Sequence, residues 1–147
     1  MAEWKIFHNF ASKMKNEKPN NNYRVLALDD HPVVIEGLKH VLSDHGGNIA
    51  FNGVTTTAAL HDLLKQGEHY DFFILDLELP DGDSFAEIAT IRSYCPGAAI
   101  LIYTMHEEPW VVARLAKLDI QGIISKANTI GSVAKAVEAI RRGGEFL

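Results

Sequence analysis

The chain has 147 residues, of which 47% are hydrophobic and 22% charged, with a formal net charge of −5 and a single cysteine. This length and composition are typical of one globular domain. One cysteine excludes an internal disulfide, and no apolar run is long enough to span a membrane, so we expect a cytoplasmic protein without a membrane partner. The negative charge makes this segment a poor DNA binder by itself, because tight DNA binding depends on Lys and Arg that neutralise phosphates.

The first 22 residues differ in pattern from the rest of the chain. Phe7 and Phe10 recur at helical spacing among lysines, and a polar breaker follows at residues 18–22. We interpret residues 1–22 as an N-terminal extension and linker, for which a frayed end and a docking helix are both compatible readings. Residues 23–147 are expected to form one domain.

From residue 23 onward, short apolar runs alternate with helical patterns. Five segments are predicted strands: Arg24–Leu28, Asn48–Val54, Asp71–Leu75, Ala99–Tyr103 and Gly122–Ser125. The first, third and fourth are nearly continuous apolar runs. Parallel strands that helices cover on both faces have this pattern.

Each interval after a predicted strand carries helical signals. Pro32 suits a first helical turn, Thr56 or Thr57 could cap the second helix, and the glycine pair at 143–144 should end the last. The inner faces are predicted to contain, in chain order, Val34, Leu38, Val41 and Leu42; Leu60, Leu63 and Leu64; Phe85, Ile88 and Ala89; Val111, Leu115 and Leu118; and Ile130, Val133, Val137 and Ile140. Five successive β–α units predict an α/β fold, a doubly wound parallel sheet with helices on both faces.

Polar side chains follow the carboxyl ends of four predicted strands. Asp29 and Asp30 follow the first strand, Asp76 the third, Thr104 the fourth and Lys126 the fifth. In an open parallel sheet, ligands bind outside these strand ends, near the switch point in strand order. One such residue alone is more often a solvated loop side chain, but the complete set in this order predicts a functional site.

The chemistry of this set points to phosphoryl transfer. Three crowded carboxylates repel one another, and Mg²⁺, which prefers oxygen ligands, removes that conflict. The cation would also screen an incoming phosphoryl group, and with Lys126 it would supply the charge stabilisation that phosphoryl transfer needs. One carboxylate could then act as the nucleophile and form an acyl phosphate, with Thr104 as a hydrogen-bond partner of a phosphoryl oxygen.

The chain from Tyr23 to Leu147 resembles the CheY-like receiver domain of bacterial two-component response regulators. Residues 25–32, Val-Leu-Ala-Leu-Asp-Asp-His-Pro, are similar to the acidic-pair segment of the NarL/FixJ subfamily, whose outputs are LuxR-type domains. Residues 71–82 resemble the phosphoacceptor segment, with Asp76 in the acceptor position. Thr104 matches the hydroxyl residue of the family, and residues 122–126 match the segment that ends in its lysine.

The resemblance implies a role for each residue of the set. Asp76 would accept a phosphoryl group from the phosphohistidine of a sensor histidine kinase. Lys126 would pair with Asp76 before the reaction and with a phosphoryl oxygen afterwards. Asp30, Asp76 and the backbone carbonyl of Glu78 would bind Mg²⁺ directly, and Asp29 would bind it through a water. The implied sheet has five strands in the order 2-1-3-4-5.

Two features bear on how the signal would leave the site. Ile123 stands where receivers usually carry Tyr, Phe or His, so the usual coupled movement of the hydroxyl residue and an aromatic ring is in doubt. Glu78 and His106, each two residues after a site residue, are expected near the path of the attacking water, where they would tune the phosphoryl lifetime. His31, His61, His69 and His106 are expected on the surface or in loops. Trp110 is expected to pack; the alternative is a place on the helix face that many receivers use to meet partners.

Three functions are compared. The first is a phosphorylation switch. The second is a phosphatase, because Asp76-Leu77-Glu78 superficially resembles the carboxylate pair of aspartate-nucleophile phosphatases; those carry Asp at the second position and a cap domain for which this chain has no length. The third is a phosphorylation-independent, receiver-like interaction module, which Ile123 motivates and the intact acidic residues oppose. We therefore expect a signalling domain and not an enzyme.

The expected partners follow from the resemblance. They are a sensor histidine kinase and a second copy in a homodimer. Residues 140–147 resemble the last receiver helix and the start of a linker to a helix-turn-helix domain. DNA contacts, and with them transcription regulation, are expected only through such a C-terminal domain, which we expect to lie outside residues 1–147; a stand-alone receiver is the alternative.

Overall fold

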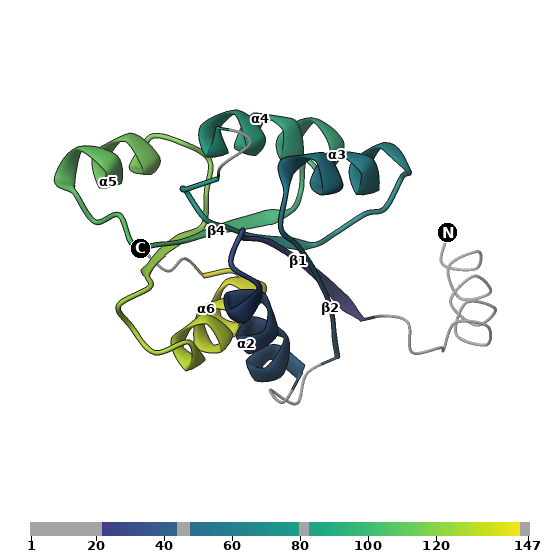
Figure 1. The fold of residues 1–147 in the computed structure, drawn as a ribbon, viewed down its shortest axis with the longest axis horizontal. Coiled ribbons are helices and arrows are strands. Elements are labelled where there is room, and N and C mark those ends of the chain that lie inside the picture. The colour runs from purple at the N-terminus through teal and green to yellow at the C-terminus, as the bar shows by residue number, and fades with distance from the viewer. Residues whose placement is uncertain (1–21, 44–47, 80–82, 145–147) are drawn as a thin grey trace, which may run out of the picture.

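A computed structural model describes residues 22–43, 48–79 and 83–144 of the chain (Figure 1). The strands are β1 (Tyr23–Leu28), β2 (Ile49–Val54), β3 (Phe72–Leu75), β4 (Ala99–Thr104) and β5 (Gly122–Ser125). The helices are α2 (Pro32–Ser43), α3 (Thr57–Lys65), α4 (Ser84–Tyr94), α5 (Pro109–Ala116) and α6 (Gly131–Arg141). Apart from residue 22, the predicted N-terminal extension lies outside the described residues. No helix in the described ranges is long and apolar enough to cross a membrane.

The five strands form one parallel sheet in the order β2-β1-β3-β4-β5, which confirms the predicted fold and strand order. The register of the sheet places the carboxyl ends of β1, β3 and β4 side by side. Leu28 pairs with Leu75, and Leu75 pairs with Ile102. The residues that directly follow β1 and β3 therefore lie side by side at the carboxyl edge of the sheet.

The sheet is covered on both faces (Figure 1). Helices α3, α4 and α5 cover one face, where Leu60, Ile91 and Leu115 are buried. Helices α2 and α6 cover the other, where Leu38 and Val137 are buried. Burial of one such side chain contributes about 1.5–3 kcal/mol relative to exposure. The near-continuous apolar strands predicted a sheet that is buried on both faces, and the structure confirms it.

The helix boundaries have local causes. Pro32 occupies the start of α2, and the Thr56 hydroxyl accepts a hydrogen bond from the Ala59 N–H at 3.1 Å, which identifies Thr56 as the cap of α3. The Asp83 carboxylate caps α4 at Phe85 N. Gly143, at φ 96°, follows α6 in the left-handed conformation that glycine adopts at low cost.

The predicted inner face of α4 is wrong at one position. Ala89 is exposed, and the buried set is Ser84, Glu87, Ile88 and Ile91, which has the i, i+3, i+4, i+7 spacing of one helix face. Two members of that face are polar, so hydrophobic patterning missed them. The Glu87 carboxylate meets His61 Nε2 at 2.7 Å, and this partner accounts for its burial between α3 and α4.

Candidate functional site

The backbone ladder of the sheet positions two carboxylates at its centre. The Asp29 N–H donates to the Val54 carbonyl at 3.1 Å, and the Asp76 N–H donates to the Leu28 carbonyl at 3.1 Å. Both residues therefore continue their strands by one step. Because strand side chains alternate between faces, Asp29 and Asp76 project on the face that α2 and α6 cover, and each is 3% exposed.

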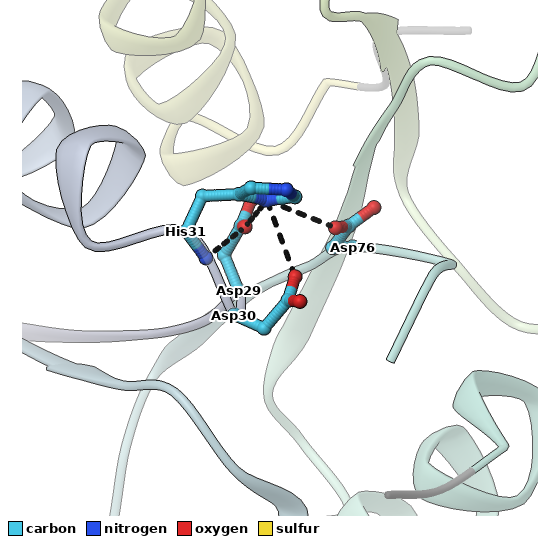
Figure 2. Close-up of side chains that lie close together, drawn as sticks. All are labelled: Asp29, Asp30, His31 and Asp76. Carbon is cyan, nitrogen blue, oxygen red and sulfur yellow. Dashed lines mark hydrogen bonds and ion pairs between the residues drawn. The ribbon is translucent and has the colours of Figure 1, made fainter. Parts of the chain in front are cut away.

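Asp29, Asp30 and Asp76, here called the acid cluster, meet the imidazole of His31 (Figure 2). One ligand atom from each of the four residues lies within 4.8 Å of the others. The Nδ1 atom of His31 is 2.7 Å from an Asp29 oxygen, 3.2 Å from an Asp30 oxygen and 4.0 Å from an Asp76 oxygen. The hydrogen bond to Asp29 raises the pKa of His31 above its usual range, which favours the charged ring beside the carboxylates.

Lys126 joins the acid cluster from the end of β5. Its backbone N–H donates to the Thr104 carbonyl at 2.8 Å, so the pairing of β4 and β5 fixes its starting point. Its ammonium lies 2.6 Å from Asp29 Oδ2 and 3.2 Å from Asp76 Oδ2. Burial acts to lower the pKa of Lys126, but the hydrogen bond and charge of Asp29, with the charge of Asp76, outweigh it and raise the pKa. The ammonium therefore stays charged and bridges the two buried acids.

The carboxyl of Asp76 is buried among charged groups that act on its pKa in opposite directions. Burial raises its pKa above the ordinary value of 3.8; the Glu78 N–H and the charge of Lys126 act against that shift, and the charge of Asp29 adds to it. Asp30 Oδ1 and Asp76 Oδ2 are both buried. In the described part of the chain they are ion-paired, with His31 Nδ1 at 3.2 Å and Lys126 Nζ at 3.2 Å, but receive no well-aligned hydrogen bond. Two such carboxylate oxygens fit a hard divalent cation, whose preferred ligands are oxygens.

Short turns beyond Asp76 and Thr104 bring two further side chains together. The Asp76 carboxylate accepts a hydrogen bond from the Glu78 N–H at 3.2 Å, and the buried Thr104 hydroxyl accepts one from the His106 N–H at 3.0 Å. Across these turns, His106 Nε2 lies 2.9 Å from the Glu78 carboxylate. A pocket of about 380 Å³, lined by Asp30, Leu77, Glu78 and Leu79, opens beside the acid cluster. The Glu78–His106 pair therefore borders the approach to Asp76.

The structure brings most of the predicted site residues together. Asp29, Asp30, Asp76 and Lys126 come together as expected, whereas the Thr104 hydroxyl is engaged by the backbone of its own turn.

One side-chain prediction is confirmed but was incomplete, and a second is wrong. His31 lies on the surface, as predicted, and its ring nitrogen also meets all three carboxylates, a contact that the sequence did not reveal. Trp110 was expected to pack and is 65% exposed.

The environment of Ile123 bears on the route of the signal. Ile123 is partly buried against the core on the face that α3, α4 and α5 cover. Thr104 projects on the same face, since Ile100 and Ile102 of the same strand belong to that core. In the register of β4 and β5, Ile123 pairs with Ile102, one step along this face from the pair of Thr104 and Ser125. The side chain at position 123 on this face is therefore aliphatic, as the sequence implied.

A family model described as the response regulator receiver domain matches residues 25–138 of the chain. The transcriptional regulatory protein RcsB of Escherichia coli K12 is 31% identical over 130 residues, which cover 86% of this chain and 59% of RcsB. The probable transcriptional regulatory protein NarL of Mycobacterium tuberculosis is 30% identical over 134 residues, 91% of this chain and 61% of that protein. The chain thus spans about three fifths of the length of these relatives.

The solved structures agree with the family match. The isolated receiver domain of RcsB from Salmonella enterica serovar Typhimurium, solved with the phosphomimetic BeF3⁻, aligns with a TM-score of 0.76 at 29% identity. That alignment covers 85% of this chain and 92% of the RcsB domain. The likeness therefore extends over a whole receiver domain.

Proposed function

Because the chain belongs to the response regulator receiver domain family, we propose that Asp76 accepts a phosphoryl group from the phosphohistidine of a sensor histidine kinase and thereby switches a transcriptional output. One observation carries the choice of residue. Among the three carboxylates, that of Asp76 is buried and places against the Lys126 ammonium, at 3.2 Å, an oxygen that receives no well-aligned hydrogen bond from the described residues. That oxygen is a nucleophile with a cation already beside it.

The chemical step is a transfer between two nucleophiles. A carboxylate oxygen of Asp76 forms a bond to phosphorus while the bond from phosphorus to the imidazole nitrogen of the donor breaks. That nitrogen keeps the bonding electron pair and takes a proton from solvent. Lys126 stabilises the negative charge on the transferred group, and Thr104 supplies a hydroxyl to one of its oxygens after it leaves the local turn.

The acid cluster supplies the ligands for Mg²⁺ in this proposal. Asp30 and Asp76 would hold the ion directly, the Glu78 backbone carbonyl would be a third ligand, and Asp29 would act through water. When bound, the ion neutralises the carboxylates and the incoming phosphoryl oxygens. Two buried carboxylate oxygens, Asp30 Oδ1 and Asp76 Oδ2, receive no well-aligned hydrogen bond from the described residues, which supports this assignment.

The output is proposed from the kind of relatives that the chain matches. They are transcriptional regulators, and they are longer than this chain. We therefore propose that phosphorylation favours a symmetric homodimer and that DNA is contacted by a C-terminal helix-turn-helix domain outside residues 1–147. In this role the domain is modified once per signal and does not turn over a free substrate.

The test is intact mass after incubation with Mg²⁺ and acetyl phosphate, a small phosphoryl donor. Wild type is expected to gain one phosphoryl group, and Asp76→Asn none. Asp83→Asn is the matched control, because Asp83 is an exposed acid that caps α4 and should leave modification unchanged. Equal modification of wild type and Asp76→Asn would refute the assignment, and no gain by wild type at high donor concentration would refute the function.

A further inference from the structure

Tyr103 is a buried aromatic residue directly beneath the proposed site. It is the residue before Thr104 in β4, is 5% exposed, and belongs to the core on the face that α2 and α6 cover. Strand alternation puts Asp29, Asp76 and Tyr103 on this face, and Thr104 and Ile123 on the other. Tyr103 therefore shares its side of the sheet with the acids that bind Lys126.

The ring of Tyr103 contacts the ammonium of Lys126. The Nζ atom lies 5.6 Å from the ring centroid, within the range of cation–π attraction. Burial raises the pKa of the Tyr103 phenol, the charge of Lys126 opposes that shift, and the charge of Asp29 adds to it. The phenol is thus close enough to experience both members of the Lys126–Asp29 pair.

Lys126 needs positioning because its side chain is long and flexible. A lysine carries a compact charge on a four-carbon stem, and holding that charge in one place costs rotamer entropy. Here the ammonium is held by Asp29 at 2.6 Å, by Asp76 at 3.2 Å and by the Tyr103 ring. Two of these contacts are carboxylates at the strand ends, and the third comes from the core. The ring thus limits how far the ammonium can withdraw from the acids.

We propose that Tyr103 is a positioning residue for Lys126, holding its ammonium against Asp29 and Asp76 and responding when the ammonium moves to a phosphoryl group. The inference rests on the proposed function. It also gives the signal a route that does not need an aromatic at position 123. Tyr103 packs in the same core cluster as Val133 and Val137 of α6, so a shift of Lys126 reaches the α2–α6 face.

The first test compares the rate at which acetyl phosphate and Mg²⁺ modify three variants. Tyr103→Phe keeps the ring and is expected to react at the wild-type rate. Tyr103→Leu is expected to react about fivefold more slowly, the size that one cation–π contact implies. Phe72→Leu removes a buried aromatic ring from the same core cluster and is the matched control, with the wild-type rate expected.

The second test reads Tyr103 in the folded wild-type chain and does not depend on the stability of Tyr103→Leu. The chain is labelled with 3-fluorotyrosine, and the ¹⁹F signal of Tyr103 is identified by its loss in Tyr103→Phe. Addition of Mg²⁺ and BeF3⁻ is expected to shift that signal in wild type and to leave it in place in Lys126→Ala.

The outcomes separate the two proposals. If wild type is modified and Tyr103→Leu reacts at the same rate, the positioning role is overturned and the proposed function stands. The same follows if Tyr103→Phe loses as much of the modification rate as Tyr103→Leu. If the ¹⁹F signal of Tyr103 shifts as much in Lys126→Ala as in wild type, the proposed response of Tyr103 to the movement of Lys126 is overturned. A wild type that is not modified at all overturns the proposed function, and the inference with it.

Discussion

At the level of single residues, Asp76 is a carboxylate that the fold holds in an unfavourable place. Burial and the charge of Asp29 raise its pKa, and Lys126 offsets only part of that effect. An ionised group in this state is stabilised when a cation arrives, because the cation compensates the buried negative charge. The reactivity proposed for Asp76 and its cost to stability therefore have the same origin.

Asp76→Asn is expected to stabilise the domain by about 1–2 kcal/mol at neutral pH without divalent cations, because it removes a poorly compensated buried charge. The folded-state pKa of Asp76 is raised, so its protonated form contributes stability below the ordinary value of 3.8, and that contribution is lost as pH rises through the folded-state pKa. The advantage of the variant should therefore grow with pH over that window. Urea unfolding at a series of pH values measures it; an advantage that is constant with pH would contradict the account.

Glu78→Ala is expected to shorten the lifetime of phosphorylated Asp76. The Glu78 carboxylate pairs with His106 at 2.9 Å beside the approach to Asp76, and its removal opens a path for water. The hydrogen bonds to Glu78 and Glu108 raise the pKa of His106 and keep the pair charged. Loss of the phosphoryl group, followed by intact mass, measures the lifetime, with Glu108→Ala as the control that removes only the second partner of His106. An unchanged lifetime in Glu78→Ala would dismiss the gating role.

Sequence reasoning located Asp29, Asp30, Asp76 and Lys126, because their position depends only on where each strand ends. It could not show that Lys126 lies closer to Asp29 than to Asp76, or that the ring of His31 turns onto the carboxylates. Those contacts depend on rotamers that the surrounding tertiary structure selects. The place where each strand ends in the sequence determines which residues reach the carboxyl edge of the sheet. The packing of the folded chain determines which of their atoms come into contact there.

At the level of elements, the strands are the best predicted part of the chain and α4 is the least. The strand boundaries agree within one residue, because apolar runs and ladder hydrogen bonds end together. On α4, Ser84 and Glu87 are buried because each has a polar partner elsewhere in the fold. The Ser84 hydroxyl donates to the Asp76 carbonyl at 2.8 Å, and Glu87 meets His61. Such long-range partners have no local signature in the sequence.

The packing of α2 on β2 leads to a prediction at this level. A Cβ added at Gly53 would collide with the branched side chain of Ile35, which has little freedom to move. Gly53→Ala is therefore expected to lower the free energy of unfolding by about 1–3 kcal/mol. Gly97→Ala is the matched control, because among the described residues no atom beyond its chain neighbours lies within 4 Å of the added Cβ. Chemical denaturation measures both, and equal stability of the two variants would show that Ile35 moves aside without cost.

At the level of the whole molecule, the sheet separates two hydrophobic cores, and the site at its carboxyl edge contains residues from both faces. Asp29, Asp76, Lys126 and Tyr103 belong to the side that α2 and α6 cover, whereas Thr104 and Ile123 belong to the side that α3, α4 and α5 cover. A phosphoryl group on Asp76 would meet Lys126 from the first side and Thr104 from the second. Because position 123 carries an isoleucine and not an aromatic residue, the aromatic contact of the site is that of Tyr103 with Lys126, on the first side.

The most direct test of the central claim is to locate the modified residue chemically. After treatment with acetyl phosphate and Mg²⁺, borohydride reduces an aspartyl phosphate to homoserine, which peptide mass spectrometry places in the sequence. We predict homoserine at position 76 and unmodified aspartate at positions 29 and 30. Homoserine at position 29 or 30, or its absence from a protein that has gained a phosphoryl group, would contradict the assignment of Asp76 as the phosphoryl acceptor.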